Sequence, residues 1–271
     1  MVEIEDSIGL VSSARIIAIA NQKGGVGKTT TAINLATAMA ATKKRVLVVD
    51  LDPQGNASTG LGIDRNARSI SSYHVLMGDS TLAQAVLSTN IPNLWVVPSS
   101  VDLSGAEIEL VDVEKRETRL RECLLEDGEF DYILIDCPPS LNLLTLNALV
   151  AAQAVLVPLQ CEFFALEGIS HLVKTIERVK HGFNPGLELH GIVLTMFDKR
   201  NNLSEMVAAD VREYFGDKVY KTVIPRNVRI SEAPSHGKPV LLYDHRSTGA
   251  EAYIHLAGEV LKRERELKVR A

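Results

Sequence analysis

Three glycines lie between two lysines near the start of the chain, in the order Lys23-Gly24-Gly25-Val26-Gly27-Lys28. Glycine lets a backbone turn tightly and present successive N–H groups to an anion, which bulkier side chains would block. The amine of Lys28 can reach β- and γ-phosphates, and the hydroxyl of the following Thr29 can ligate Mg²⁺. These residues therefore predict a loop that binds the phosphates of a nucleotide.

The sequence on either side of the loop supports this prediction. The apolar run Ile16–Ala20 is typical of a strand, and the pattern from Thr29 to Ala41 is typical of a helix. The start of a helix offers free N–H groups and a partial positive charge to an anion. The strict pattern G-x-x-x-x-G-K-[ST] does not match, because its first glycine would fall on Gln22.

Two carboxylates follow the second apolar run, in the stretch Val48-Val49-Asp50-Leu51-Asp52-Pro53. Asp52 lies where it could orient a water molecule for attack on a γ-phosphate, with Asp50 nearer to Mg²⁺. Phosphoryl transfer depends on a positioned water and on charge neutralisation more than on a strong base. Taken alone, D-x-D-P is also typical of an Asx turn with a solvated aspartate.

A third carboxylate ends the apolar run from Tyr132 to Ile135. Asp136 stands where a strand-terminal acid would hold Mg²⁺ through a water. Pro138 and Pro139 stop the strand and shape a loop near the γ-phosphate.

Runs rich in Val, Ile and Leu alternate with helical patterns along the chain. Continuous rather than alternating apolar runs favour strands buried on both faces. The alternation predicts an α/β fold: a doubly wound, mostly parallel sheet flanked by helices on both faces. The expected strands are Ile16–Ala20, Val46–Val49, Leu94–Val97, Tyr132–Ile135, Ala154–Pro158, Gly191–Met196 and Val219–Ile224. The expected helices are Thr29–Ala41, Gly105–Leu125, Leu141–Ala151, Leu166–Lys180, Ser204–Phe215 and Gly249–Glu266, and residues 65–92 stay unassigned.

Composition limits the class of protein. The 271 residues are 46% hydrophobic and 23% charged, which fits a soluble globular chain. No apolar run approaches the roughly 20 residues of a spanning helix. The three cysteines, Cys123, Cys137 and Cys161, show no metal-ligand spacing and fit a reducing cytoplasm. We expect a single domain over residues 15–266, an N-terminal tail (1–14) and a short C-terminal tail (267–271).

Several motifs together resemble the ParA/Soj chromosome and plasmid partitioning ATPases of the deviant Walker A (ParA/MinD) superfamily. The motifs are NQKGGVGKTTTA, DLDPQGN, GAEIEL, DCPPSL, CEFFALEG and PRNVRISEAPSHGKPV. The resemblance extends from Arg15 to about Glu259. It implies binding of ATP with Mg²⁺, weak ATPase activity and an ATP-dependent homodimer. It also implies nonspecific binding to double-stranded DNA, stimulation by a ParB-type centromere-binding protein, and a cytoplasmic, nucleoid-associated location without a membrane.

The resemblance assigns roles to individual residues. The ATP-binding residues are Lys23, Gly24, Gly25, Val26, Gly27, Lys28, Thr29, Thr30, Pro225 and Asn227, of which the last two contact adenine. Lys23, Lys28 and Asp52 are the catalytic residues, and Lys23 crosses the dimer interface to the γ-phosphate of the partner. Thr29 ligates Mg²⁺, and Asp50 and Asp136 act on it through water.

DNA binding is expected from a local excess of positive charge in an acidic chain. Nine Lys and Arg residues face six Asp and Glu residues between Lys199 and Arg246, a balance of +3 against −5 for the whole chain. Phosphate neutralisation of this kind is independent of sequence and sensitive to salt. The resemblance points to Arg200 and Arg229 as the DNA contacts.

Other interpretations remain open at this stage. A MinD-like membrane-associated ATPase would need an amphipathic C-terminal helix, for which Leu261, Leu267 and Val269 supply few large apolar residues. A reductase like the nitrogenase iron protein would need paired cysteines for a cluster. A nucleotide-bound scaffold without hydrolysis would not require Lys23 and Asp52.

Overall fold

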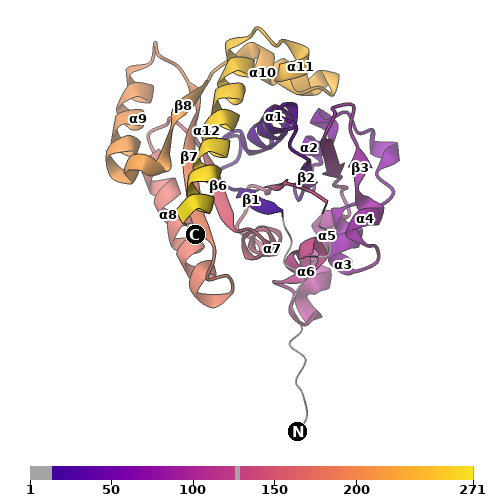
Figure 1. Cartoon of the computed structure of the whole chain (residues 1–271). Helices are drawn as coiled ribbons and strands as arrows, with labels where there is room; N and C mark the ends of the chain where they lie inside the picture. Colours follow the sequence, from indigo (N-terminus) through magenta and orange to yellow (C-terminus); the bar gives the residue numbers. More distant parts are fainter. Residues whose placement is uncertain (1–13, 126–128, 271) are drawn as a thin grey trace.

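The computed structural model describes residues 14–125 and 129–270, and Figure 1 shows them as one sheet covered by helices on both faces. Within these residues the sheet has eight strands, in the spatial order β3-β4-β2-β5-β1-β6-β7-β8. All neighbours are parallel except β3 and β4. The predicted fold class is therefore confirmed. The strands are β1 (Arg15–Ile19), β2 (Val46–Asp50), β3 (Leu87–Ser88), β4 (Leu94–Val97), β5 (Tyr132–Asp136), β6 (Ala154–Gln160), β7 (Glu188–Phe197) and β8 (Val219–Pro225).

Two separate apolar layers cover the sheet. One layer packs α1, α11 and α12 against one face, and the other packs α5 to α9 against the opposite face. Every residue of β2 and of β5 is buried, as expected for strands covered on both sides. The helices are α1 (Lys28–Ala41), α2 (Asn56–Gly60), α3 (Ser72–Met77), α4 (Leu82–Ala85), α5 (Leu103–Glu109), α6 (Arg119–Leu125), α7 (Leu143–Ala151), α8 (Ala165–Gly182), α9 (Asn202–Phe215), α10 (Val228–Glu232), α11 (Val240–Tyr243) and α12 (Thr248–Arg270).

The prediction of one helix from Gly105 to Leu125 was wrong. The segment contains α5, a 3₁₀ turn (η2, Leu110–Asp112), a connection and then α6. Lys115 in the connection has φ +54°, which an α-helix cannot accommodate. The charged residues around Lys115 also offer no apolar face to bury, so nothing favours a continuous helix there.

The predicted domain boundaries stay a prediction. The predicted tail of residues 1–14 lies outside the described residues, apart from Ala14, which is buried. At the other end, α12 continues to Arg270, past the predicted domain boundary at residue 266.

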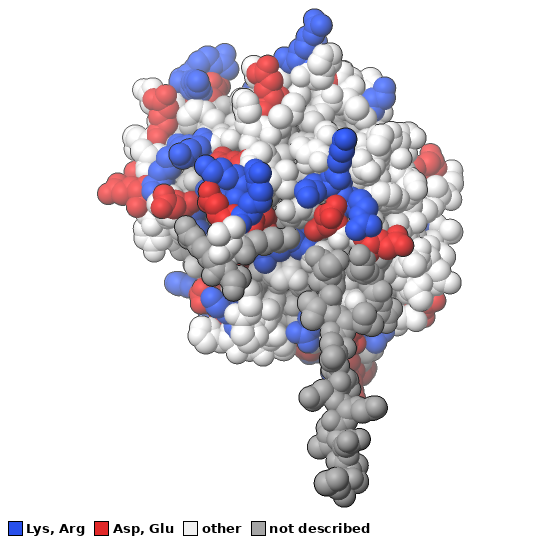
Figure 2. Space-filling view, in the orientation of Figure 1, with Lys and Arg blue, Asp and Glu red and all other residues white. Residues whose placement is uncertain are grey.

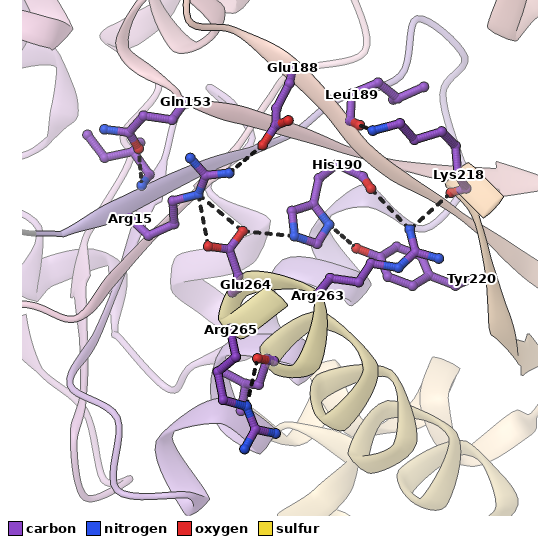
Figure 3. Close-up of polar contacts among 12 residues, drawn as sticks. Arg15, Gln153, Glu188, Leu189, His190, Lys218, Tyr220, Arg263, Glu264 and Arg265 are labelled. Atoms are coloured by element: carbon purple, nitrogen blue, oxygen red, sulfur yellow. Dashed lines mark hydrogen bonds and ion pairs between the residues drawn. The ribbon is translucent and has the colours of Figure 1, made fainter. Parts of the chain in front are cut away.

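Buried ionic contacts attach α12 to the amino-terminal ends of the strands (Figure 3). Arg15, the first residue of β1, lies 2.7 Å from Glu188 at the start of β7 and 3.0 Å from Glu264 of α12. Nε2 of His190 lies 2.9 Å from Glu264, and Nδ1 of His190 contacts the hydroxyl of Tyr220. Three strands and the C-terminal helix therefore share one polar cluster.

Glu264 is the central acid of this cluster and is only 2% exposed. Burial opposes its ionisation, but the contact with His190 and the charge of Arg15 outweigh burial and hold its pKa below the ordinary value. A carboxylate with a lowered pKa stabilises the fold above its unfolded pKa, and this contribution is lost as the pH falls through the folded pKa.

Replacing Glu264 by glutamine should destabilise the fold by about 3 kcal/mol at neutral pH, because Arg15 would lose a buried partner. The difference from wild type should shrink as the pH falls below about 4, where the wild-type carboxylate itself becomes protonated. Urea unfolding at several pH values measures both effects. Glu266→Gln is the matched control, because Glu266 is exposed and lies 3.9 Å from Lys262. Equal effects of the two substitutions would contradict the role of Glu264.

Candidate nucleotide site

Three neighbouring strands bring the predicted phosphate loop and the predicted acids to the carboxyl-terminal edge of the sheet. The loop follows β1, Asp136 ends β5 and Asp50 ends β2. In the parallel register, Asp136 lies beside Ile19 on one side and beside Asp50 on the other. The strand order β2-β5-β1 therefore places both acids next to the loop, where ligands bind in folds of this kind.

The loop has the conformation that its glycines permit. Gly25 has φ +74°, and Gly27, at the start of α1, has φ +91°, a region that side chains with a Cβ rarely adopt. The loop is also attached to two other strands. Asn21 donates to the carbonyl of Pro158 in β6 at 2.7 Å, and Thr195 of β7 donates to the carbonyl of Val26 at 2.8 Å. These bonds hold the loop backbone in place before any ligand arrives.

The two lysines of the loop have different surroundings. Lys28 is buried, its Nζ donates to the carbonyl of Lys23 at 3.0 Å, and burial lowers its pKa against the opposing charges of Asp136 and Asp52. A phosphate beside this amine would favour its charged form. The side chain of Lys23 is half exposed and pairs with Glu162, which follows β6. Lys28 thus faces the interior of the loop, whereas Lys23 lies on the outer surface.

Asp136 has the surroundings of a carboxylate that binds a cation. It is completely buried, and among the described residues neither carboxylate oxygen has a partner at good hydrogen-bond geometry, although Thr29 lies close by. Burial and the nearby charge of Asp50 raise its pKa well above the usual value, whereas Thr29 and Lys28 favour the ionised form. A divalent cation would satisfy both oxygens and offset the repulsion. Among the described residues no three His, Cys, Asp or Glu side chains form a metal cluster, so most ligands of a Mg²⁺ would come from Thr29, phosphate and water.

Asp50 is already engaged within the chain. Its Oδ2 accepts hydrogen bonds from the backbone N–H of Ser58 at 2.8 Å and from the Ser58 hydroxyl at 2.6 Å, and burial raises its pKa. Asp50 would therefore contact a Mg²⁺ ion through a water molecule. Asp52 is 8% exposed, and its Oδ1 accepts from the N–H of Gln54 at 3.0 Å. Its role toward a water stays a prediction.

The predicted adenine residues lie at and just after the carboxyl end of β8, which is three strands away from β1 in the sheet. Pro225 ends β8 and lines a cavity of about 560 Å³ together with Phe197 and Thr248. The side chain of Asn227 donates to the Thr248 hydroxyl at 2.9 Å and accepts from the N–H of Arg229 at 2.8 Å. Asn227 therefore caps α10 and joins it to α12, and its role toward a base stays a prediction.

Each predicted DNA-binding arginine has an acidic partner within the chain. Arg200 is 88% exposed, and two of its guanidinium nitrogens donate to Asp198, whose pKa they lower to about 2. Arg229 lies 3.0 Å from Glu232 and 3.4 Å from Asp244. Both arginines follow the carboxyl ends of β7 and β8, which are neighbouring strands. A DNA phosphate would have to compete with these carboxylates.

The nine basic residues counted between Lys199 and Arg246 do not form one surface. Lys218 precedes β8 and Lys221 lies near its start, and both line a cavity at that end of the strand. Arg226 and Arg229 follow the far end, about 20 Å away for a strand of this length. On the face seen in Figure 2, Lys and Arg side chains lie among Asp and Glu side chains. The local balance of +3 therefore does not describe one DNA-binding surface. Only the few arginines beside the candidate nucleotide site remain candidates for DNA contact.

Three residues of the site were not predicted. Thr195 fixes the loop, Ser58 satisfies Asp50, and Glu162 pairs with Lys23. Glu162 belongs to the motif CEFFALEG and Thr195 to the expected strand Gly191–Met196, but their contacts join segments that are distant in sequence.

Comparison with known proteins agrees with the geometry. The profile of a family described as "AAA domain" matches residues 14–189. The chromosome partitioning protein ParA of Caulobacter vibrioides is 61% identical over 260 residues, 95% of this chain and 97% of that protein. The sporulation initiation inhibitor protein Soj of Bacillus subtilis is 54% identical, over 91% of this chain and 98% of its own.

A solved structure shares the fold. The cobyrinic acid a,c-diamide synthase of Mycobacterium smegmatis, with bound ADP and magnesium, superposes with a TM-score of 0.82 at 39% identity. The match covers 93% of this chain and 96% of that one. From the deviant phosphate loop, the buried acids at the sheet edge and these similarities, the chain belongs to the ParA/Soj family of chromosome partitioning ATPases.

Proposed function

We propose that this chain is a DNA segregation ATPase that binds ATP with Mg²⁺ between the loop after β1 and the acids that end β2 and β5. The buried carboxylate of Asp136, which has no hydrogen-bond partner at good geometry among the described residues and lies near Lys28, is the observation that carries the proposal. The N–H groups of Gly24 to Thr30 and the amine of Lys28 hold the phosphates. Mg²⁺, when bound, neutralises charge on the phosphate oxygens, and Thr29 and Asp136 hold it.

Hydrolysis requires a water placed in line with the γ-phosphate. Asp52 would supply a carboxylate oxygen for this water. Its backbone N–H donates to Asp50, and its Oδ1 accepts from the N–H of Gln54, so both its backbone and its side chain are held. A single orienting carboxylate without a strong base fits slow turnover. Phosphate would then be released after the ParB-type partner protein adjusts the site.

Dimerisation would complete the site. The half-exposed amine of Lys23 pairs with Glu162, so it would be available to the γ-phosphate of a second copy once it leaves Glu162. A Cβ at Gly24 would meet only Pro139, at 3.9 Å, so this glycine is not required by packing within the chain. Both features support a face-to-face homodimer in which each Lys23 stabilises charge in trans.

The ATP dimer would bind DNA without sequence preference, through Arg200 and Arg229 of both copies. Two weak phosphate-binding surfaces held together gain affinity through effective concentration, which makes DNA binding follow nucleotide state. A ParB-type centromere-binding protein would stimulate hydrolysis and release the dimer. The expected location is the cytoplasm, on the nucleoid.

The structure gives little support to the membrane-associated alternative. No helix among the described residues is long and apolar enough to cross a bilayer. Ile254 and Val269 are the exposed large apolar side chains described on α12, and they stand at opposite ends of that helix. A continuous apolar face, which binding to a membrane surface requires, is not formed by these two residues.

Lys23→Ala should retain ATP binding and lose ATP-dependent dimers, because the amine acts on the partner's phosphate. Lys28→Ala should lose ATP binding itself, since its buried amine faces the loop interior. Fluorescent-nucleotide titration and light scattering separate the two effects. An unchanged dimer fraction in Lys23→Ala would remove the proposed role in trans.

Asp52→Ala should lower the rate of ATP hydrolysis by about a hundredfold or more while ATP-dependent dimers persist, because only the orientation of water is lost. Phosphate release and gel filtration with ATP measure the two properties. Asp64→Ala, an exposed N-cap acid outside the site, serves as the control. Hydrolysis at the wild-type rate would exclude Asp52 from the reaction.

Replacing Arg200 and Arg229 together by glutamate should abolish DNA binding at low salt without affecting the dimer. Arg178→Glu makes half of this charge change at an exposed position of α8 and should leave binding unchanged. Binding to a labelled duplex at several salt concentrations tests this, since each lost phosphate contact reduces the salt slope by about one. Wild-type affinity in the double variant would place the DNA site elsewhere.

A further inference from the structure

Arg68 is a buried cation to which the nucleotide chemistry described above gives no role. It follows a 3₁₀ turn (η1, Arg65–Ala67), within the residues for which the sequence predicted no element, and it is only 8% exposed. The four hydrogen bonds of its guanidinium all go to uncharged oxygens. Burial of a charge is unfavourable unless the surroundings compensate for it, so the position of this guanidinium requires an explanation.

The two terminal nitrogens of Arg68 connect three segments of the chain. Nη1 donates to the carbonyl of Gly55 at 3.2 Å and to the carbonyl of Ser99 at 3.3 Å. Nη2 donates to the hydroxyl of Thr59 at 2.8 Å and to the carbonyl of Ile63 at 2.7 Å. Gly55 is the N-cap of α2, Ile63 follows α2, and Ser99 follows β4. One rigid, planar fork therefore ties both ends of α2 to the segment after β4.

Gly55 links this fork to Asp52. The N–H of Gly55 donates to the carbonyl of Asp52 at 2.9 Å, and the N–H of Gln54 donates to the Asp52 carboxylate at 3.0 Å. Gly55 has φ +62°, and a Cβ built on it would lie 2.4 Å from Nη1 of Arg68 and 3.1 Å from the carbonyl oxygen of Ser99. Backbone conformation and contact with the guanidinium therefore both require glycine here, and the turn that holds Asp52 closes against Arg68.

The fork also supports the surroundings of Asp50. The N–H of Ser99 donates to the hydroxyl oxygen of Ser58 at 3.0 Å, and that hydroxyl donates to Asp50 at 2.6 Å. Burial lowers the pKa of Arg68, and the charge of Asp50 is the largest influence that opposes this change. Since β4 lies beside β2 on the side away from β5, the buried acids have Lys28 on one side and Arg68 on the other.

We propose that Arg68 is a positioning residue for hydrolysis: its guanidinium holds the turn from Asp52 to Gly55 and so orients the Asp52 carboxylate toward the attacking water. The inference rests on the proposed function, since Arg68 acts only through Asp52. Without the fork, the carbonyl of Gly55 and the start of α2 lose their attachment to the segment after β4, and Asp52 samples a wider range of positions. A misplacement of about 1 Å can lower a rate by about a hundredfold.

Arg68→Ala should therefore lower the kcat of ATP hydrolysis about tenfold or more. The KM for ATP and the ATP-dependent dimer should stay at wild-type values, because Asn21 and Thr195 hold the phosphate loop independently of Arg68. Guanidinium ion, at concentrations too low to unfold the protein, should occupy the vacated space and restore most of the lost kcat. The same concentration of sodium chloride should restore none of it.

Arg119→Ala is the matched control. Arg119 is partly buried and joins α6 to α3 by donating to the carbonyls of Leu76 at 3.0 Å and Met77 at 2.9 Å. Its Nη2 also lies 2.6 Å from a Cβ built on a glycine of positive φ, Gly78. Loss of this purely structural arginine should lower the urea midpoint of unfolding and leave kcat unchanged, with or without guanidinium.

Thr59→Val tests the same contact at an exposed position, where a failure to fold is not expected. It removes the hydroxyl that bonds to both Arg68 and Gly55, and it should lower kcat severalfold at unchanged KM. Wild-type kcat in Thr59→Val, or a loss in Arg68→Ala that guanidinium does not restore, would overturn the role of Arg68 alone. Hydrolysis at the wild-type rate in Asp52→Ala would instead overturn the proposed reaction and this inference with it.

Discussion

The repulsion between two buried carboxylates is the constraint on which the site depends. Asp50 and Asp136 end adjacent strands in the same register, and both are completely buried. Ser58 satisfies Asp50 with two hydrogen bonds, whereas no described residue bonds to the oxygens of Asp136 in this way. The amine of Lys28 and the start of α1 supply the nearby positive potential. The side-by-side order of β2, β5 and β1 therefore creates a site with both signs of charge. A divalent cation can balance the carboxylates there, and the positive potential of Lys28 and α1 can balance a polyphosphate.

The phosphate loop is held by more of the sheet than the strand that precedes it. Asn21 connects it to β6, Thr195 connects it to β7, and Gly24 lies against Pro139 of the loop after β5. Four strands thus determine where the N–H groups of the loop point. A loop that is rigid before binding loses less conformational entropy when the phosphates arrive. The same contacts provide physical routes by which events at β5 or β7 can reach the nucleotide.

Much of this arrangement was predictable from the sequence, for identifiable reasons. Strands such as β2 and β5 are buried on both faces, so their uninterrupted apolar runs locate them within a residue or two. The strand β3 has two partly exposed residues and leaves no such pattern. The false helix after Gly105 arose because local propensity does not reveal that Lys115 adopts a positive φ.

The contacts of the site were less predictable than its residue types. Glycine, lysine and aspartate at fixed spacing identify phosphate chemistry without knowledge of the fold. The bonds of Thr195 to Val26 and of Lys23 to Glu162 depend on strand order, which no local pattern contains. The ion pair of Arg229 with Asp244 also joins residues that are distant in sequence, whereas the pairs of Arg200 with Asp198 and of Arg229 with Glu232 are local.

The attachment of α12 has a practical consequence for imaging. Its first residue, Thr248, bonds to Asn227 near the nucleotide edge, and Glu264 is fixed to Arg15 at the opposite edge. A helix of 23 residues is about 35 Å long. A fluorescent protein fused behind this helix would therefore emerge on the side of the molecule away from the proposed dimer face, so tagged and untagged subunits could pair in the same cell without steric conflict.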